Sequence, residues 1–183
     1  MGNKLMMKLF VGSESVFFLA LILAYVYFWR SAHYDEAAQK MLHIKTTGFF
    51  TLLLIASSFT FWKAETYFKE GNQQKLKLWL MVTIGLGIVF LAGQAHEYYG
   101  LIQHHLTFSS GEFGSSFYTL TGFHGLHVLS GLIVLGIILT LVFLGYIKKD
   151  VSGVVSTVGI YWHFVDAVWL VVFTVVYVLP YLL

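Results

Sequence analysis

The stretch that decides the fold is residues 116–147, SFYTLTGFHGLHVLSGLIVLGIILTLVFLGYI, which contains no Asp, Glu, Lys or Arg. A helix needs about 20 mostly apolar residues to cross the hydrocarbon core of a bilayer. This stretch is longer, so we expect a tilted membrane-spanning helix here. Four other stretches have the same character, and the full set of predicted spans is 7–29, 46–63, 78–99, 116–147 and 154–182. The sequence therefore predicts an all-α, polytopic membrane protein: a bundle of five transmembrane helices forming one domain over residues 1–183.

The composition excludes several classes of protein. Of the 183 residues, 58% are hydrophobic and only 11% are charged, against about 25% charged in a typical soluble domain. The chain is therefore neither a soluble globular protein nor a disordered one. A net charge of +2 is too small for a nucleic-acid partner. The absence of cysteine excludes disulfides, thiolate metal centres and a cysteine nucleophile.

The distribution of Lys and Arg predicts the orientation in the membrane. Cytoplasmic loops carry an excess of these residues. Eight lie on one side of the predicted spans: Lys4, Lys8, Lys63, Lys69, Lys75, Lys77, Lys148 and Lys149. The other side has three, Arg30, Lys40 and Lys45. We therefore expect a cytoplasmic N-terminus and an extracytoplasmic C-terminus.

Glu14 is the acidic residue of the first predicted span. An ionisable side chain in hydrocarbon costs several kcal/mol, so it marks a functional site by default. With few partners in sight, we expect a largely protonated carboxyl. It either forms a hydrogen bond to a neighbouring helix or contacts a lipid, a proton-conducting region or another subunit.

Three further spans carry polar side chains at helical spacing. Gln94 and Glu97 share a face near the outer end of the third span, where they either cap the helix end or form a contact network. His124 and His127 are three residues apart in the fourth span, as are His163 and Asp166 in the fifth. Helical rise places His163 roughly 13 Å from the cytoplasmic end and His127 roughly 16 Å from the outer end, which is the same level. We therefore expect His127 to pair with His163, and His124 with Asp166.

Histidines on facing helices also raise the question of haem or metal binding. No repeated histidine pair recurs at a spacing that builds a bis-histidine site, and the Glu-x-x-His pattern of ferritin-like metal sites is absent. We therefore predict no catalytic centre, cofactor or metal in this chain. A small independent transporter or a haem-binding membrane anchor is the alternative class, but no inverted repeat or broken helix is evident.

Two strings are specific enough to indicate a family. Residues 122–128, GFHGLHV, and 161–170, YWHFVDAVWL, resemble signature segments of subunit III of haem-copper respiratory oxidases. The strings QAHEYY at 94–99 and GSSFY at 114–118 precede both of them and fit the family's order. Residues 13–18, SESVFF, resemble the segment that carries the family's buried, carbodiimide-reactive carboxylate, which would be Glu14 here.

The resemblance implies a function and a set of partners. The chain is similar to the five-helix bacterial form of a family whose long form has seven helices. It implies a subunit without redox centres in the bacterial inner membrane, with haem and copper in partner subunits. Subunit I would be the main contact, with subunits II and IV and phospholipid as further partners. The complex would be a proton-pumping terminal oxidase that takes electrons from cytochrome c or, alternatively, from a quinol. This subunit would stabilise the catalytic subunit and support proton uptake.

Overall fold

Five long helices make up the part of the chain that the computed structural model describes, residues 2–30, 41–147 and 152–182. They are α1 (Gly2–Trp29), α3 (Ile44–Glu70), α4 (Gln73–Gln103), α5 (Gly111–Phe143) and α6 (Ser152–Phe173). A π-helical turn (Thr174–Val178) and the short α7 (Leu179–Leu182) continue α6. All five long helices are long and apolar enough to cross a membrane. The predicted all-α class with five transmembrane helices is therefore confirmed.

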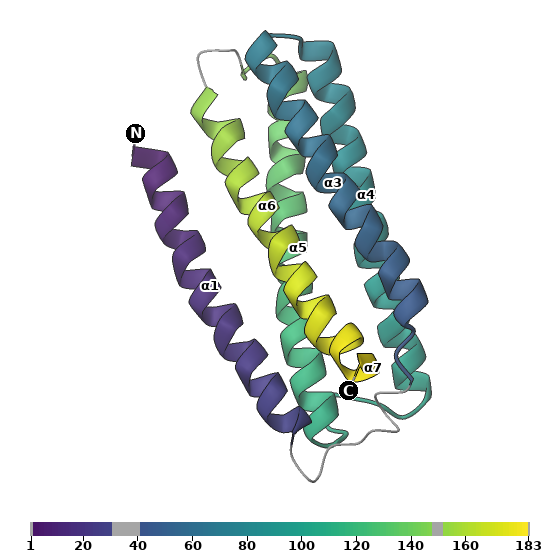
Figure 1. Ribbon diagram of the computed structural model, residues 1–183. Coiled ribbons are helices and arrows are strands. Elements are labelled where there is room, and N and C mark those ends of the chain that lie inside the picture. Colours follow the sequence, from purple (N-terminus) through teal and green to yellow (C-terminus); the bar gives the residue numbers. More distant parts are fainter. Residues whose placement is uncertain (1, 31–40, 148–151, 183) are drawn as a thin grey trace.

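Helices α5 and α6 lie at the centre of the contacts. They pack against each other and against α1, while α6 also packs against α3, α5 against α4 and α3 against α4. Figure 1 shows α1 along one edge of the bundle and the α3–α4 pair along the other, with the two termini at opposite ends. An odd number of membrane crossings requires such a separation.

A tight turn joins α3 to α4 for a local reason. Gly71 ends α3 in the left-handed region at φ 79°, which costs a residue without Cβ nothing. Its N–H and that of Asn72 donate to the carbonyls of Phe68 and Tyr67, which satisfies the free carbonyls of the helix end. The Asn72 side chain then accepts a hydrogen bond from the backbone N–H of Lys75 and caps α4. The two helices are therefore antiparallel neighbours.

The helix boundaries differ from the predicted spans at two places. The second predicted span is short, but α3 continues through its polar end to Glu70, because helical hydrogen bonds do not stop where the hydrocarbon does. The fourth predicted stretch reaches Ile147, but α5 ends at Phe143. Gly145 adopts φ 76° there, and the N–H groups of Gly145 and Tyr146 close the helix end on the carbonyls of Val142 and Leu141.

Two glycines leave room for the large indole of Trp162 in the core. Trp162 of α6 is fully buried. A Cβ at Gly87 of α4 would lie 3.0 Å from its ring, and one at Gly131 of α5 would lie 2.9 Å from it. Small residues at such positions let helix backbones approach closely, which is how membrane helices gain packing contacts.

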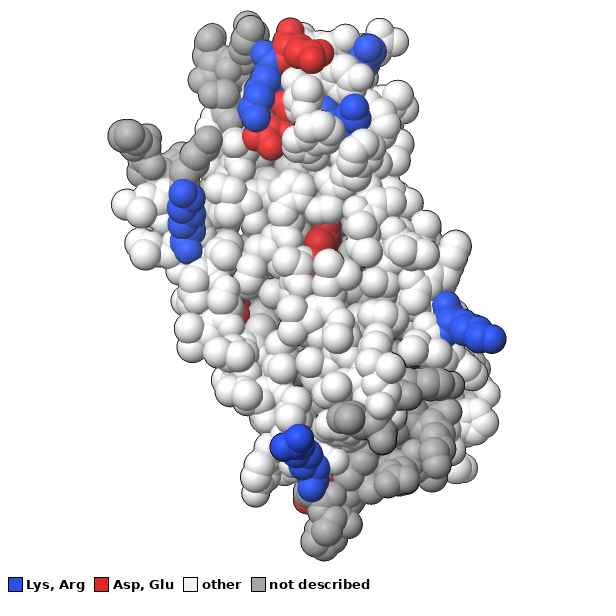
Figure 2. Space-filling view, in the orientation of Figure 1, with Lys and Arg blue, Asp and Glu red and all other residues white. Residues whose placement is uncertain are grey.

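Charged side chains gather at the two ends of the bundle. Figure 2 shows Lys and Arg at both ends of the bundle and at two places on its sides, and a central area without Lys or Arg that holds small acidic areas. This distribution fits a membrane-embedded middle. Of the basic residues used to predict the orientation, Lys40, Lys148 and Lys149 lie outside the described residues.

Candidate functional site

Hydrogen bonds join α3 to α6 along much of their length. The pairs are Thr51 with Trp169 (2.9 Å), Ser57 with Trp162 (3.1 Å), Ser58 with His163 (2.6 Å) and Glu65 with Ser156 (2.7 Å). In the first two pairs the indole N–H donates to a hydroxyl, and in the last the serine hydroxyl donates to the carboxylate. We call the residues of these pairs the α3–α6 seam. The seam therefore links two helices whose contact residues are far apart in the sequence.

Sequence reasoning did not single out the hydroxyls of α3. The sequence does contain a pattern that indicates them. Thr51, Ser58 and Glu65 recur at seven-residue intervals, which places these polar side chains on one face of a helix. Serine and threonine are common in membrane helices and mostly bond to their own backbone, so the pattern was easy to miss.

The predicted pairing of His127 with His163 is wrong. The Nδ1 atom of His163 bonds to Ser58 of α3. The Nε2 atom of His127 instead lies 3.1 Å from Oε2 of Glu14, on α1. The depth estimate used helical rise alone, and rise does not determine the direction in which a side chain points around its helix axis.

Glu14 therefore has one partner on a neighbouring helix, which is the first of the two alternatives given for it above. The Nδ1 atom of His127 lies 2.7 Å from the backbone carbonyl of Phe123. A carbonyl only accepts, so Nδ1 must carry a proton. The 3.1 Å contact between Nε2 and Oε2 joins the imidazole of His127 to the carboxyl of Glu14.

Apolar groups surround the Glu14–His127 pair. The ring of Phe18 packs edge-on against the imidazole, with 4.9 Å between the ring centroids. A cavity of about 460 Å³ lies beside it, lined mainly by apolar side chains of α1, α5 and α6, including Phe10, Phe123 and Tyr161. The Tyr161 hydroxyl donates to the backbone carbonyl of His127. The hydrogen-bonded Glu14–His127 pair thus borders an apolar groove.

His124 and Asp166 do not form the predicted pair. Both are buried, and no nitrogen of His124 and no carboxyl oxygen of Asp166 has a hydrogen-bond partner among the described residues. The His124 ring lies against aromatic rings, with its centroid 4.7 Å from that of Trp169. Asp166 lies beside Ser58, whose hydroxyl is engaged with His163. The large indole of Trp169 lies next to His124, at the place where the Asp166 carboxyl was predicted.

Gln94 and Glu97 share a helix but enter two different sets of contacts. The Gln94 amide donates to the Thr121 carbonyl at 2.7 Å and to the Tyr98 hydroxyl at 3.2 Å, and so faces α5. Glu97 accepts from the hydroxyl of Thr47 on α3 at 3.0 Å and from that of Tyr177 at 2.8 Å. Glu97 therefore connects α4 to α3 and to the π-helical turn.

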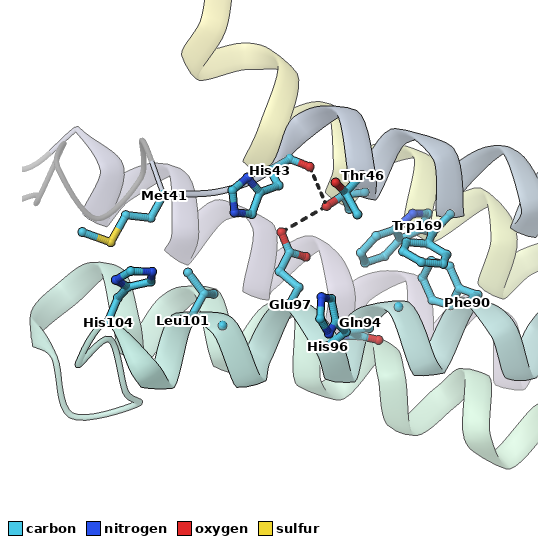
Figure 3. Close-up of a pocket in the computed structure, with 14 residues that line it drawn as sticks. Met41, His43, Thr46, Phe90, Gln94, His96, Glu97, Leu101, His104 and Trp169 are labelled. Carbon is cyan, nitrogen blue, oxygen red and sulfur yellow. Dashed lines mark hydrogen bonds between the residues drawn. The ribbon is translucent and has the colours of Figure 1, made fainter.

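A cavity of about 280 Å³ opens beside Glu97. Figure 3 shows the Glu97 carboxyl pointing from α4 toward α3, with the His43 imidazole beside it. His96 and His104 also line the cavity, and Phe90 and Trp169 form part of its apolar wall. The cavity thus brings one carboxyl and three imidazoles to the end of the bundle that carries the C-terminus.

The described residues do not bring three or more His, Cys, Asp or Glu side chains together in a way that could hold a metal ion. The histidines of the interior are instead occupied by Ser58, by Glu14 and by aromatic rings. That this chain carries no haem or metal stays a prediction.

The fold and these contacts define a class: a polytopic helical membrane protein with paired polar groups inside its bundle. Among known proteins, the cytochrome c oxidase subunit III family matches residues 1–181. The chain belongs to this family, the haem-copper oxidase subunit III family that the sequence strings indicated.

Individual relatives agree with this assignment. The probable cytochrome c oxidase subunit 3 of Mycobacterium leprae is 37% identical over 91% of this chain and 83% of the relative. The cytochrome c oxidase subunit 3 of Synechocystis is 36% identical over 93% of this chain and 73% of the relative. The cytochrome c oxidase subunit 3 of Thermostichus vulcanus is 36% identical over 93% of this chain and 84% of the relative.

Proposed function

We propose that this chain is subunit III of a proton-pumping haem-copper terminal oxidase that takes its electrons from cytochrome c. The family match over residues 1–181 carries the proposal. Haem and copper reside in the partner subunits, and this chain has no catalytic centre of its own. It binds mainly to subunit I, with subunits II and IV as further neighbours in a bacterial inner membrane.

The chain's role is to stabilise the catalytic subunit and to support proton uptake. Glu14 is its contact with a lipid or with the proton-uptake side of the complex. Two observations support this role: the Glu14 carboxyl lies 3.1 Å from Nε2 of His127, and an apolar groove that suits an acyl chain lies beside this pair. The remaining polar residues, Gln94, Glu97, His124, His127, His163 and Asp166, act structurally within the bundle.

The test is to purify the complex through an affinity tag on this chain. We expect haem and copper to co-purify in fixed proportion and the complex to oxidise reduced cytochrome c. Oxidation of a quinol but not of cytochrome c would contradict the proposed electron donor, but it would leave the proposed role as subunit III unchanged. A preparation without haem would remove the proposed function.

The non-catalytic role has a separate test. We expect the complex without this chain to keep its haem spectrum and initial rate but to lose activity during sustained turnover. A Soret band that stays with the isolated chain in stoichiometric amount would contradict the absence of haem.

The proposed orientation places the N-terminus in the cytoplasm and the C-terminus outside. A reporter fused to the C-terminus should read as extracytoplasmic, and one inserted at Gly71 should read as cytoplasmic. The opposite pattern would reverse the orientation.

A further inference from the structure

The cavity beside Glu97 has a polar mouth and an apolar inner end. Four exposed polar side chains line its mouth: His43, Thr46, His96 and His104. Figure 3 shows His104 at one end of the cavity and the rings of Phe90 and Trp169 at the other. The cavity therefore leads from the end of the bundle that carries the C-terminus into the interior, past the Glu97 carboxyl.

Helical rise places Glu97 near the boundary of the hydrocarbon. The 31 residues of α4 span about 46 Å, against a hydrocarbon core of about 30 Å, so each end of a centred helix extends about 8 Å beyond the core. Glu97 precedes the last residue of α4, Gln103, by about 9 Å. The mouth of the cavity, which is closer to the helix end, therefore lies among lipid headgroups and water.

Water suits this cavity better than a lipid tail does. The volume of about 280 Å³ is many times what a single water molecule needs. Water inside a protein also needs several polar partners, and the Glu97 carboxyl and the His43 imidazole beside it are such partners. Hydrocarbon would leave these polar groups without hydrogen bonds.

The Glu97 carboxyl is held in position at the cavity. The Thr47 hydroxyl lies 3.0 Å from its Oε1 atom, and the Tyr177 hydroxyl lies 2.8 Å from its Oε2 atom. Each carboxyl oxygen has two lone pairs, so both can accept a further hydrogen bond from water. The titratable groups that interact with the carboxyl electrostatically are His43, Tyr98, Tyr118 and Tyr177.

We propose that this cavity is a water-filled inlet through which the Glu97 carboxyl exchanges protons with the aqueous phase at that end of the bundle. In each exchange the carboxyl gives its proton to a water molecule, which becomes hydronium, and the carboxylate takes a proton back from hydronium. Glu97 thus has a role beyond its structural contacts with α3 and the π-helical turn. The proposal depends only on residues of this chain, and not on the proposed role in an oxidase.

Phe49 and Phe50 of α3 offer a matched comparison within the parent chain. They are neighbours at nearly the same depth, but Phe50 lines the cavity and is half-buried, whereas Phe49 is 58% exposed on the surface of the bundle. In the intact complex in a lipid bilayer, a pulse of hydroxyl radicals generated from water should oxidise Phe50 several-fold more than Phe49, because lipid or a neighbouring subunit shields Phe49. Equal oxidation of the two rings, or stronger oxidation of Phe49, would overturn the proposal.

A large side chain at Gly100 should obstruct the inlet. Gly100 lines the cavity, and no neighbouring side chain lies within 4 Å of its Cβ position. Gly85 of α4 has equally free space but is not among the cavity-lining residues, so Gly85→Phe is the matched control. We expect Gly100→Phe to lower the oxidation of Phe50 several-fold and Gly85→Phe to leave it unchanged. The same oxidation in both variants would contradict entry of water through this cavity.

Infrared spectra in heavy water test the proton exchange itself. At acidic pH, where the carboxyl is protonated, the Glu97 band is identified as the carboxyl band that is missing in Glu97→Gln. We expect this band to shift at once in the parent and in Gly85→Phe, and at least tenfold more slowly in Gly100→Phe. A band that does not shift in the parent, or that shifts at one rate in all three proteins, would overturn the proposal.

Discussion

The helices α1 and α3 both pack against α6, but they do so by different means. On the α3 side, indole, hydroxyl, imidazole and carboxyl groups form the four hydrogen-bonded pairs of the α3–α6 seam. On the other side, Phe18 and Tyr25 are the buried ones among the described side chains of α1, and most of the rest are half-buried or exposed. Glu14 binds α1 to His127 of α5.

The difference shows what holds a membrane bundle together. Lipid tails are as apolar as leucine, so apolar side chains gain little by leaving lipid for a neighbouring helix. Close packing on small residues and hydrogen bonds then decide which helices associate firmly. By this criterion α3 is firmly joined to α6 and α1 is loosely joined. The predictions below test this contrast, from the largest expected effect to the smallest.

Replacing a glycine where α3 and α6 pack closely should have the largest effect on stability. In Gly159→Leu on α6 the new Cβ would lie 2.8 Å from the Phe61 ring of α3, which is buried and cannot move away. We expect a loss of about 2–3 kcal/mol in the free energy of unfolding in detergent. Gly12→Leu on α1 is the control, since nothing lies within 4 Å of its Cβ position. Equal stability of the two variants would break the contrast.

Removing one hydroxyl of the seam should have an intermediate effect. Thr51→Val keeps the shape of the side chain but leaves the buried N–H of Trp169 without its acceptor at 2.9 Å. We expect a loss of about 1–1.7 kcal/mol in the free energy of unfolding, the upper end for hydrogen bonds between membrane helices, because both side chains are buried. Ser13→Ala on α1 should change nothing measurable, because that exposed hydroxyl bonds only to the carbonyl of Phe10 in its own helix. A larger loss for Ser13→Ala than for Thr51→Val would contradict the role given to the seam.

Breaking the Glu14–His127 contact should have a smaller effect on stability. Hydrogen bonds between membrane helices contribute about 0.6 kcal/mol on average, so Glu14→Ala should lower the free energy of unfolding by about that amount. Glu14→Gln should resemble the parent, since an amide N–H can donate to Nε2 of a neutral His127.

The function of Glu14 has its own readout. In the intact complex we expect Glu14→Ala, but not Glu14→Gln, to lose activity faster than the parent during sustained turnover. We also expect a hydrophobic carbodiimide to label Glu14. Labelling of Glu65 with Glu14 untouched would remove the special role of Glu14.

Asp166→Leu should have the smallest effect on stability. The sign of the change in the free energy of unfolding shows whether the buried carboxyl destabilises or stabilises the fold. Neither carboxyl oxygen has a hydrogen-bond partner among the described residues, so the carboxyl is buried at a cost. Leucine has a similar size and no such cost. We expect thermal denaturation to show a free energy of unfolding that is unchanged or raised by less than about 0.5 kcal/mol. A clear loss would mean that Asp166 has a stabilising partner.

The sequence by itself determined the number of helices and the family. The length of each apolar stretch is a local property, and it required five membrane-spanning helices without knowledge of any contact. Strings such as GFHGLHV at 122–128 indicated the subunit III family, and the match over residues 1–181 confirmed it. The sequence also drew attention to Glu14, His127, His163 and Asp166, because polar groups in hydrocarbon are conspicuous.

Only the tertiary structure decided which of these groups meet. Helical rise fixes the depth of a side chain, but the rotation of each helix about its axis is set by packing, as where Trp162 fits between Gly87 and Gly131. That packing turned His163 toward Ser58 and His127 toward Glu14, partners 105 and 113 residues away in the chain. It also placed Trp169, rather than Asp166, against His124. The contacts depend on the shapes of several helices at once, and no single stretch of sequence contains that information.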